Sequence, residues 1–154
     1  MHLFFNDLER GIGTSLYGRR MYETMLYWED PENGADDAVT KEYGEIWRAG
    51  EKIVYSRTLE EVSSARTRLE REFDAAPIER LKKDAELDIS VGGPTLAAEA
   101  IKVGLVDEFH LVVVPIIVGG GTPVFPPGVG VELELIDERR FGNGAVHLHY
   151  QTRS

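Results

Sequence analysis

The chain contains no cysteine, and this absence removes several kinds of chemistry at once. Without thiols there is no disulfide framework, no thiolate zinc site and no cysteine nucleophile. Long apolar runs are also missing, since the longest, residues 111–118, is too short to span a bilayer and contains Pro115. Residues 1–10 lack the basic and apolar regions of a secretory signal. We therefore expect a soluble, cytoplasmic protein.

Positive charge is scarce as well. The chain has 17 Lys and Arg residues against 27 Asp and Glu residues, which gives a formal net charge of -10 at pH 7. Such a surface repels phosphate backbones and anionic lipid, so we expect neither nucleic-acid nor membrane binding. A small anionic ligand can bind only where basic side chains and backbone N–H groups gather locally.

With 154 residues, 42% of them hydrophobic, the chain has the size of a single domain over residues 1–154. The patterns predict helices over residues 1–10, 21–27, 40–49, 77–85 and 96–103, with Thr40 as the N-cap of the third. They predict strands over residues 14–18, 52–56, 87–91, 108–114, 131–138 and 145–152. Residues 58–73 fit a helix in their first part and a strand after it. This order predicts an α/β fold with a mostly parallel sheet flanked by helices and a C-terminal antiparallel hairpin.

The segment from Ser90 to Leu96 is the strongest binding motif in the chain. A buried strand runs into Gly92 and Gly93, and a helix begins at once at Pro94. Glycines let the backbone approach a ligand closely, and the free N–H groups of the new helix can hold a pyrophosphate without any lysine. An ordinary tight turn with Thr95 as the helix cap is the alternative interpretation.

Two other predicted strands end in basic residues. Gly18 is followed by Arg19 and Arg20, and Ser56 is followed by Arg57. Each pattern alone is typical of a solvated loop. Ligands of open α/β sheets bind beyond the carboxyl ends of the strands, however, and arginine matches phosphate geometry. Together the three strand ends predict a nucleotide site, with the arginines suited to the additional phosphate that distinguishes NADPH from NADH.

Five segments in order along the chain resemble the dihydrofolate reductase fold, and more closely its riboflavin-biosynthesis reductase branch. They are residues 16–23, 52–58, 90–96, 104–110 (Gly-Leu-Val-Asp-Glu-Phe-His) and 115–125 (Pro-Ile-Ile-Val-Gly-Gly-Gly-Thr-Pro-Val-Phe). The resemblance implies a three-layer dihydrofolate reductase-like domain, a strand at residues 66–69, an NADPH cofactor, a small-molecule substrate and a homodimer. By resemblance, the NADPH groove is lined by Gly18, Arg19, Arg20, Ser56, Arg57, Gly92, Gly93, Pro94, Thr95 and Leu96.

The chain departs from this family at its beginning. Family members start with a mid-sheet strand and an active-site loop, whereas this chain opens at what resembles the family's first helix. The expected function is an NADPH-dependent reductase of a small heterocyclic or carbonyl compound. An NADP-binding module without reductase activity, lacking that strand, is the alternative. Nothing selects a proton donor among His2, Asp7 and Glu9, and residues 131–152 are the expected dimer contact.

His147 and His149 share one face of the last predicted strand, as two metal ligands would. No carboxylate motif accompanies them in the sequence. A solvated strand face is therefore the expected role of these histidines, and no metal site is predicted.

Overall fold

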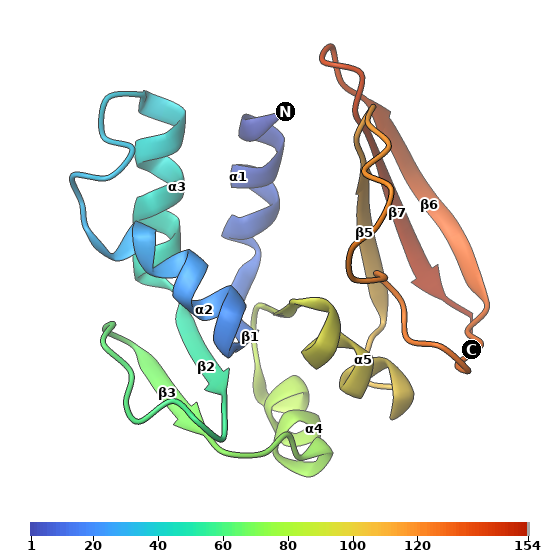
Figure 1. Ribbon diagram of the computed structural model, residues 1–154, viewed down its shortest axis with the longest axis horizontal. Helices are drawn as coiled ribbons and strands as arrows, with labels where there is room; N and C mark the ends of the chain where they lie inside the picture. Colours follow the sequence, from blue (N-terminus) through green and yellow to red (C-terminus); the bar gives the residue numbers. More distant parts are fainter. Residues whose placement is uncertain (154) are drawn as a thin grey trace.

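The computed structural model describes residues 1–153 and contains two separate β-sheets. In chain order its elements are α1 (His2–Arg10), β1 (Ile12–Gly18), α2 (Arg19–Met25), the 3-10 helix η1 (Leu26–Glu29), α3 (Ala38–Ala49), β2 (Glu51–Tyr55), β3 (Thr67–Glu70), α4 (Ala75–Asp84), β4 (Asp88–Gly92), α5 (Pro94–Lys102), β5 (Glu108–Val113), β6 (Leu133–Arg140) and β7 (Val146–Thr152). Figure 1 shows the sheet formed by β5, β7 and β6 standing beside the helix-covered half of the molecule. Within residues 1–153, no helix combines the length and the apolar character needed to cross a membrane.

The first sheet is parallel and has the strand order β3-β2-β1-β4. Alternate side chains of its strands point to opposite faces, and both faces are apolar. Leu16 and Ile53 pack with Leu96 of α5 on one face. Tyr17 and Val54 pack against α2 on the other. Burial on both faces is typical of parallel sheets, and it explains why the consecutive residues Ile53 and Val54 of β2 are both buried.

The second sheet is antiparallel and has the order β5-β7-β6. The predicted α/β architecture, with helices flanking a parallel sheet and a C-terminal antiparallel hairpin, is confirmed. The hairpin of β6 and β7 does not extend the parallel sheet, however, since β7 pairs with β5 instead. Within residues 1–153, β4 and β5 each leave one edge without a strand partner.

A groove of about 470 Å³ lies between the two sheets. Ile89 and Val91 of β4 and His110 of β5 line it, and Leu8 and Glu9 contribute from α1. The groove therefore combines an apolar wall with a few ionisable groups, and it follows the unpaired edges of both sheets.

The helix predicted for the first part of residues 58–73 is wrong. The chain forms an irregular loop there, with a turn at residues 65–66 just before β3 begins at Thr67, and several of its polar groups bond to side chains rather than forming helical hydrogen bonds. The backbone N–H of Leu59 donates to the Ser56 hydroxyl at 3.0 Å. The Arg71 guanidinium donates to the carbonyl oxygens of Ser56 and Leu59. The strand implied by the resemblance is present as β3.

The cap of α3 also differs from the prediction. The helix begins at Ala38 after Asp37, whose carboxylate accepts the Thr40 backbone N–H at 3.1 Å and the Thr40 hydroxyl at 2.6 Å. Thr40 is therefore the partner of the cap and lies within the first turn. An Asp is at least as good an N-cap as a Thr, and the earlier of the two residues takes the role.

Candidate functional site

Three strands of the parallel sheet end at the same level. β1 ends at Gly18, β2 at Tyr55 and β4 at Gly92. The register pairs Gly18 with Tyr55 and Tyr17 with Gly92, so the carboxyl ends form one edge. The chain leaves β1 toward β2, and it leaves β4 in the opposite direction, toward the second sheet. This change of direction next to β1 is where open α/β sheets form their ligand crevice.

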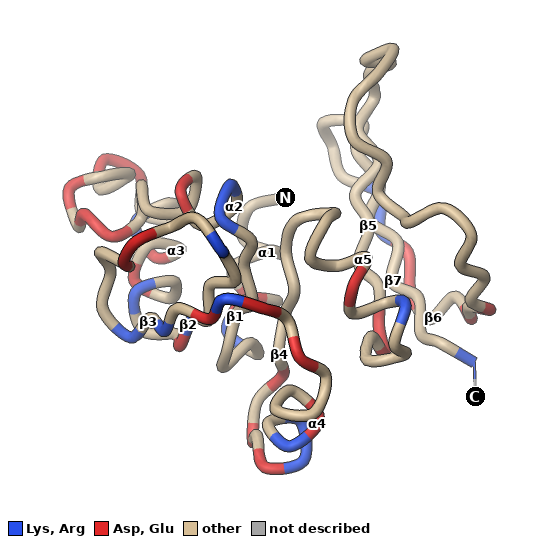
Figure 2. Tube along the Cα trace, turned by 60° about the horizontal axis from the view of Figure 1, so that its bottom comes forward, with Lys and Arg blue, Asp and Glu red and all other residues tan. Residues whose placement is uncertain are grey.

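A cleft of about 530 Å³ opens at this edge. Its walls come from the segments that follow β1, β2, β3 and β4, and they consist of Gly18, Arg19, Arg20, Met21, Tyr55, Arg57, Arg71, Glu72, Phe73, Thr95, Leu96 and Glu99. Four arginines thus face two glutamates in a chain whose net charge is -10. Figure 2 shows a basic segment at the start of α2, whereas acidic residues are spread over most of the molecule. The cleft is a local basic site, as an anionic ligand requires.

Two of the cleft arginines are held by neighbouring side chains. Arg19 donates to Glu23 at 2.6 Å and to the Thr58 hydroxyl at 2.8 Å. Arg57 forms an ion pair with Glu72 at 3.1 Å. Arg20 makes no ion pair with any residue in the described part of the chain. The guanidinium of Arg20 is therefore the cleft cation that is available to an external anion.

The turn between β4 and α5 has the backbone that the glycine motif predicts. Gly93 has a φ of 95°, a left-handed conformation that favours glycine. Gly93 is the N-cap of α5, and no side chain caps the helix. The alternative of Thr95 as the cap is therefore wrong. Thr95 and Leu96 line the cleft, so the uncapped first turn of a nine-residue helix lies at its wall.

The structure places the predicted site residues in two groups. The cleft is lined by Gly18, Arg19, Arg20, Arg57, Thr95 and Leu96. The other predicted residues, Ser56, Gly92, Gly93 and Pro94, do not line the cleft. Ser56 is buried and accepts backbone N–H groups of its own loop. A side chain at Gly92 would meet Met21 and Tyr17, and Gly93 and Pro94 form the turn into α5.

Arg71 is a cleft residue that the sequence analysis missed. It follows β3 directly, so it is a fourth basic residue at a strand end of the same sheet. The position of Arg71 at a strand end was not recognised in the sequence because residues 58–73 fit a helix as well as a strand. Its guanidinium also donates to backbone carbonyls, so this arginine closes the loop after β2 as well as adding positive charge.

Tyr55 was also missed, although it is the last residue of β2 and lines the cleft. Its ring packs against Phe73 with the centroids 5.6 Å apart. Burial, with Glu70 nearby, raises the pKa of Tyr55 to about 12. The phenol is therefore neutral at physiological pH and can donate its O–H to a bound molecule.

The three candidate proton donors of α1 lie in different surroundings. Glu9 lines the groove between the sheets, and burial raises the pKa of its carboxyl group. Asp7 is exposed and pairs with Arg10. The His2 ring packs edge-on against Tyr43 at 5.7 Å. Of the three, Glu9 alone lines a described cavity.

The parallel sheet, its covering helices and the antiparallel sheet at the C-terminal end define a dihydrofolate reductase-like α/β protein. The chain belongs to the RibD C-terminal domain family, whose model matches residues 1–147. This is a family of reductase domains, and the family predicted from the five segments is confirmed.

The comparisons give one curated relative that spans nearly the whole chain and several solved structures. The uncharacterized protein YyaP of Bacillus subtilis (strain 168) is 30% identical over 148 residues, which are 95% of this chain and 77% of YyaP. A putative riboflavin biosynthesis protein from Shewanella sp. PV-4 superposes with a TM-score of 0.74 at 18% identity, over 96% of this chain and 78% of that one. Acinetobacter baumannii RibD (form 2) superposes with a TM-score of 0.67 at 13% identity, over 99% of this chain and 51% of RibD. At these identities the solved structures establish the fold.

Proposed function

We propose that the cleft at the ends of β1, β2 and β4 binds NADPH and that the chain is an NADPH-dependent reductase of a small heterocyclic or carbonyl compound. The observation that carries the proposal is the gathering of four arginines around one crevice of a strongly acidic chain. Membership of the RibD C-terminal domain family supports the reductase part of the proposal.

The residues of the cleft fit a dinucleotide phosphate. A side chain at Gly18 would enter open space, so the backbone there leaves room for a ligand. Thr95 and Leu96 present backbone N–H groups of the uncapped first turn of α5. Arg20, which lacks an ion-pair partner among the described residues, suits the terminal phosphate of NADPH because a guanidinium binds phosphate bidentately.

NADPH would supply a hydride, and the chain would supply position and electrostatics. The arginines and the first turn of α5 would hold the phosphates. Tyr55 offers a neutral O–H at the same edge. Phe73 lines both the cleft and the groove between the sheets, so a second, less polar molecule in the groove would lie next to the cofactor.

The second candidate is an NADP-binding module without turnover. The observation that favours it is the division of the sheet, because the groove between β4 and β5 runs beside the proposed cofactor site. An open groove of this kind admits water, and water beside the nicotinamide weakens every electrostatic contribution to catalysis.

Two measurements separate these proposals. Protein fluorescence titration tests binding, and we expect NADPH to bind more tightly than NADH. Loss of NADPH absorbance with added pterins, pyrimidinones or quinones tests turnover. Binding with turnover supports the reductase, and binding without turnover of any of these substrates supports the module. Absence of NADPH binding would overturn both.

A further inference from the structure

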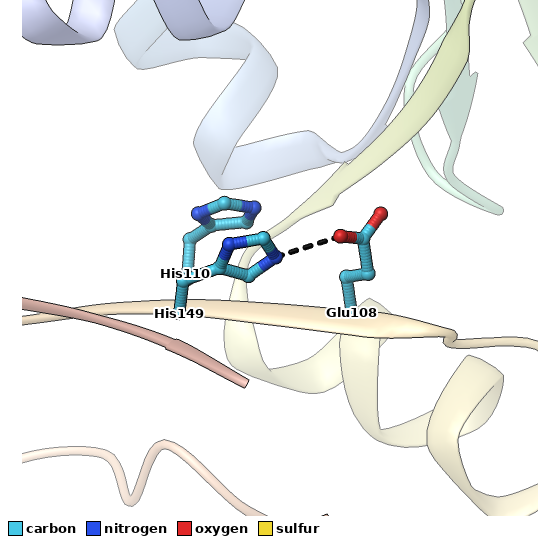
Figure 3. Close-up of side chains that lie close together, drawn as sticks. All are labelled: Glu108, His110 and His149. Atoms are coloured by element: carbon cyan, nitrogen blue, oxygen red, sulfur yellow. Dashed lines mark hydrogen bonds and ion pairs between the residues drawn. The ribbon is translucent and has the colours of Figure 1, made fainter. Parts of the chain in front are cut away.

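Three ionisable side chains meet on the antiparallel sheet, away from the arginine-lined cleft. Glu108 and His110 are two residues apart on β5, so they share one face of the strand. His149 on β7 lies directly opposite His110 in the antiparallel register. One ligand atom from each of the three residues lies within 4.8 Å of the other two. Figure 3 shows the two imidazoles and the carboxylate gathered on the same side of the sheet.

Hydrogen bonds and ring contacts already orient these side chains. His149 Nε2 lies 2.7 Å from Glu108 Oε1. The rings of His110 and His149 are stacked with their centroids 4.2 Å apart. His110 Nδ1 lies 3.0 Å from His147 Nε2, which leaves Nε2 of His110 free to bind a ligand. The three donor atoms are thus held by paired strands, which are more rigid than a loop.

His147 lies beside the group, on the same face of β7 as His149. Its side chain is 1% exposed, and its Nδ1 has no hydrogen-bond partner among the described residues. The Phe4 ring packs against it at 4.6 Å. Burying an imidazole is costly unless its nitrogens form hydrogen bonds. The contact of His147 with His110 offsets part of this cost and fixes the tautomer of His110, and metal-binding histidines almost always use their second nitrogen for such an orienting hydrogen bond.

The chemistry of the three donors is specific. Two imidazoles and one carboxylate form a ligand set that zinc enzymes use, whereas Mg²⁺ and Ca²⁺ prefer oxygen ligands alone. The acidic chain also attracts cations. In tetrahedral zinc sites the ligand atoms are roughly 3.4 Å apart, a spacing that small side-chain rotations would reach here.

We propose that Glu108, His110 and His149 bind a divalent transition-metal ion, with Zn²⁺ as the best match and a fourth coordination position open to water or to another ligand. The site is independent of the proposed cofactor cleft, since it shares no residue with it. Glu108 and His110 also line the groove between the sheets, so the open position of the metal would lie at the groove.

The experiment is isothermal titration of the untagged, chelator-treated protein with ZnCl₂. We expect one ion per chain. His149→Ala and Glu108→Gln should each weaken binding by about 10-fold or more, since even the loss of a residue that only orients a metal ligand has an effect of this size. Glu108→Gln keeps nearly the same shape, and its amide can still hydrogen-bond to His149, so a loss there reports the carboxylate ligand rather than the fold.

His2→Ala is the matched control, because it removes an imidazole from α1 and leaves the cluster intact. It should bind Zn²⁺ as the wild type does. Co²⁺ should give the visible absorption of a four-coordinate site in the wild type and in His2→Ala, but not in Glu108→Gln. Zn²⁺ should raise the unfolding temperature of the same two proteins. The proposal is overturned if wild type and His110→Ala/His149→Ala bind Zn²⁺ equally, or if His2→Ala is the variant that loses binding.

Discussion

Gly18 allows ligand binding to be tested without disturbing the fold. Its φ of -75° is accessible to any residue, and a side chain added there meets no atom within 4 Å. Gly18→Asp therefore should fold normally, and Asp is a favourable residue at the start of a helix. Its carboxylate would stand in the proposed phosphate site. We expect NADPH affinity to fall by about 10-fold or more, which corresponds to about 1.4 kcal/mol, in a fluorescence titration.

Gly142→Asp controls for the added charge. Gly142 is exposed in the turn between β6 and β7, and a side chain there also meets no atom within 4 Å. This variant should bind NADPH with wild-type affinity. Equal losses in the two variants, or full affinity in Gly18→Asp, would place the cofactor outside this cleft.

Arg20 is expected to decide the preference between the two nicotinamide cofactors. It lines the cleft and has no ion-pair partner within residues 1–153. A charged hydrogen bond contributes about 1.5–3 kcal/mol, so Arg20→Gln should weaken NADPH binding by about 10-fold or more and leave NADH binding unchanged. Arg140→Gln, on the exposed strand β6, should change neither. Equal loss of affinity for NADPH and NADH in Arg20→Gln would contradict this role.

At the level of single elements, α4 depends on its N-terminal cap. The Asp74 carboxylate accepts the Ala76 backbone N–H at 3.2 Å. Asp74→Ala should therefore lower the free energy of unfolding by about 1 kcal/mol in urea denaturation. Asp84→Ala is the comparison: this exposed residue ends the same helix, where a negative charge is unfavourable, so its loss should be neutral or slightly stabilising. A smaller decrease in the free energy of unfolding for Asp74→Ala than for Asp84→Ala would contradict the capping role.

The cap of α3 predicts a dependence of stability on pH. Hydrogen bonds from the Thr40 side chain and backbone hold the pKa of Asp37 below its usual value. Because the folded-state pKa is the lower one, the contribution of Asp37 is complete above the unfolded pKa of about 3.9 and is lost as the pH falls through the folded value. Asp37→Asn keeps an acceptor but does not titrate. Its stability should fall less steeply with acid than that of the wild type, as measured by thermal unfolding between about pH 5 and pH 2. Parallel curves for the two proteins would contradict the prediction.

Elements with local signals were predicted well from the sequence. The glycine turn before α5 and the Gly-Arg-Arg end of β1 follow from short-range chemistry, since glycine conformations and strand ends depend on adjacent residues. The segment before β3 was not predicted correctly, because its apolar residues have helical spacing. Its backbone instead forms hydrogen bonds with the side chains of Ser56 and Arg71, which lie outside the segment. Such contacts leave no periodic trace in the sequence.

The two candidate sites also differ in how far they could be predicted from the sequence. Strand ends that lie on one parallel sheet converge by topology, so a basic site at the edge of the sheet could be anticipated. The contact between Glu108 and His149 could not, because it depends on β7 pairing with β5 as well as with β6. The solvated role expected for His147 is also wrong, because Phe4 of α1 packs against the ring and the ring is buried.

On the scale of the whole molecule, the segment after β5 and the strand β6 expose large apolar side chains. Ile116, Ile117 and Val118, after β5, are 67%, 96% and 76% exposed. Leu135 and Ile136 of β6 are 49% and 48% exposed. Large exposed apolar patches mark interaction surfaces. We therefore expect a homodimer that uses the antiparallel sheet and the segment after β5, with about twice the mass of one chain in size-exclusion chromatography with light scattering.

A charge in the exposed segment after β5 tests the contact. Ile117→Lys should shift the protein toward the mass of one chain, because a lysine cannot be buried at such an interface without a partner. Val103→Lys, at the exposed residue that follows α5, should leave the dimer intact. A concentration-independent monomer in the wild type would refute the dimer.

The central position of β7 in its sheet also affects how the protein is made. β7 is the strand that joins β5 to β6, and it is synthesised after both. While the ribosome adds the residues between β5 and β7, at roughly 5–20 residues per second, the parallel sheet can already form, but β5 and β6 have no strand to pair with. Their apolar side chains then remain accessible to chaperones and to other nascent chains. Translation speed over the last third of the message should therefore influence how much protein folds correctly.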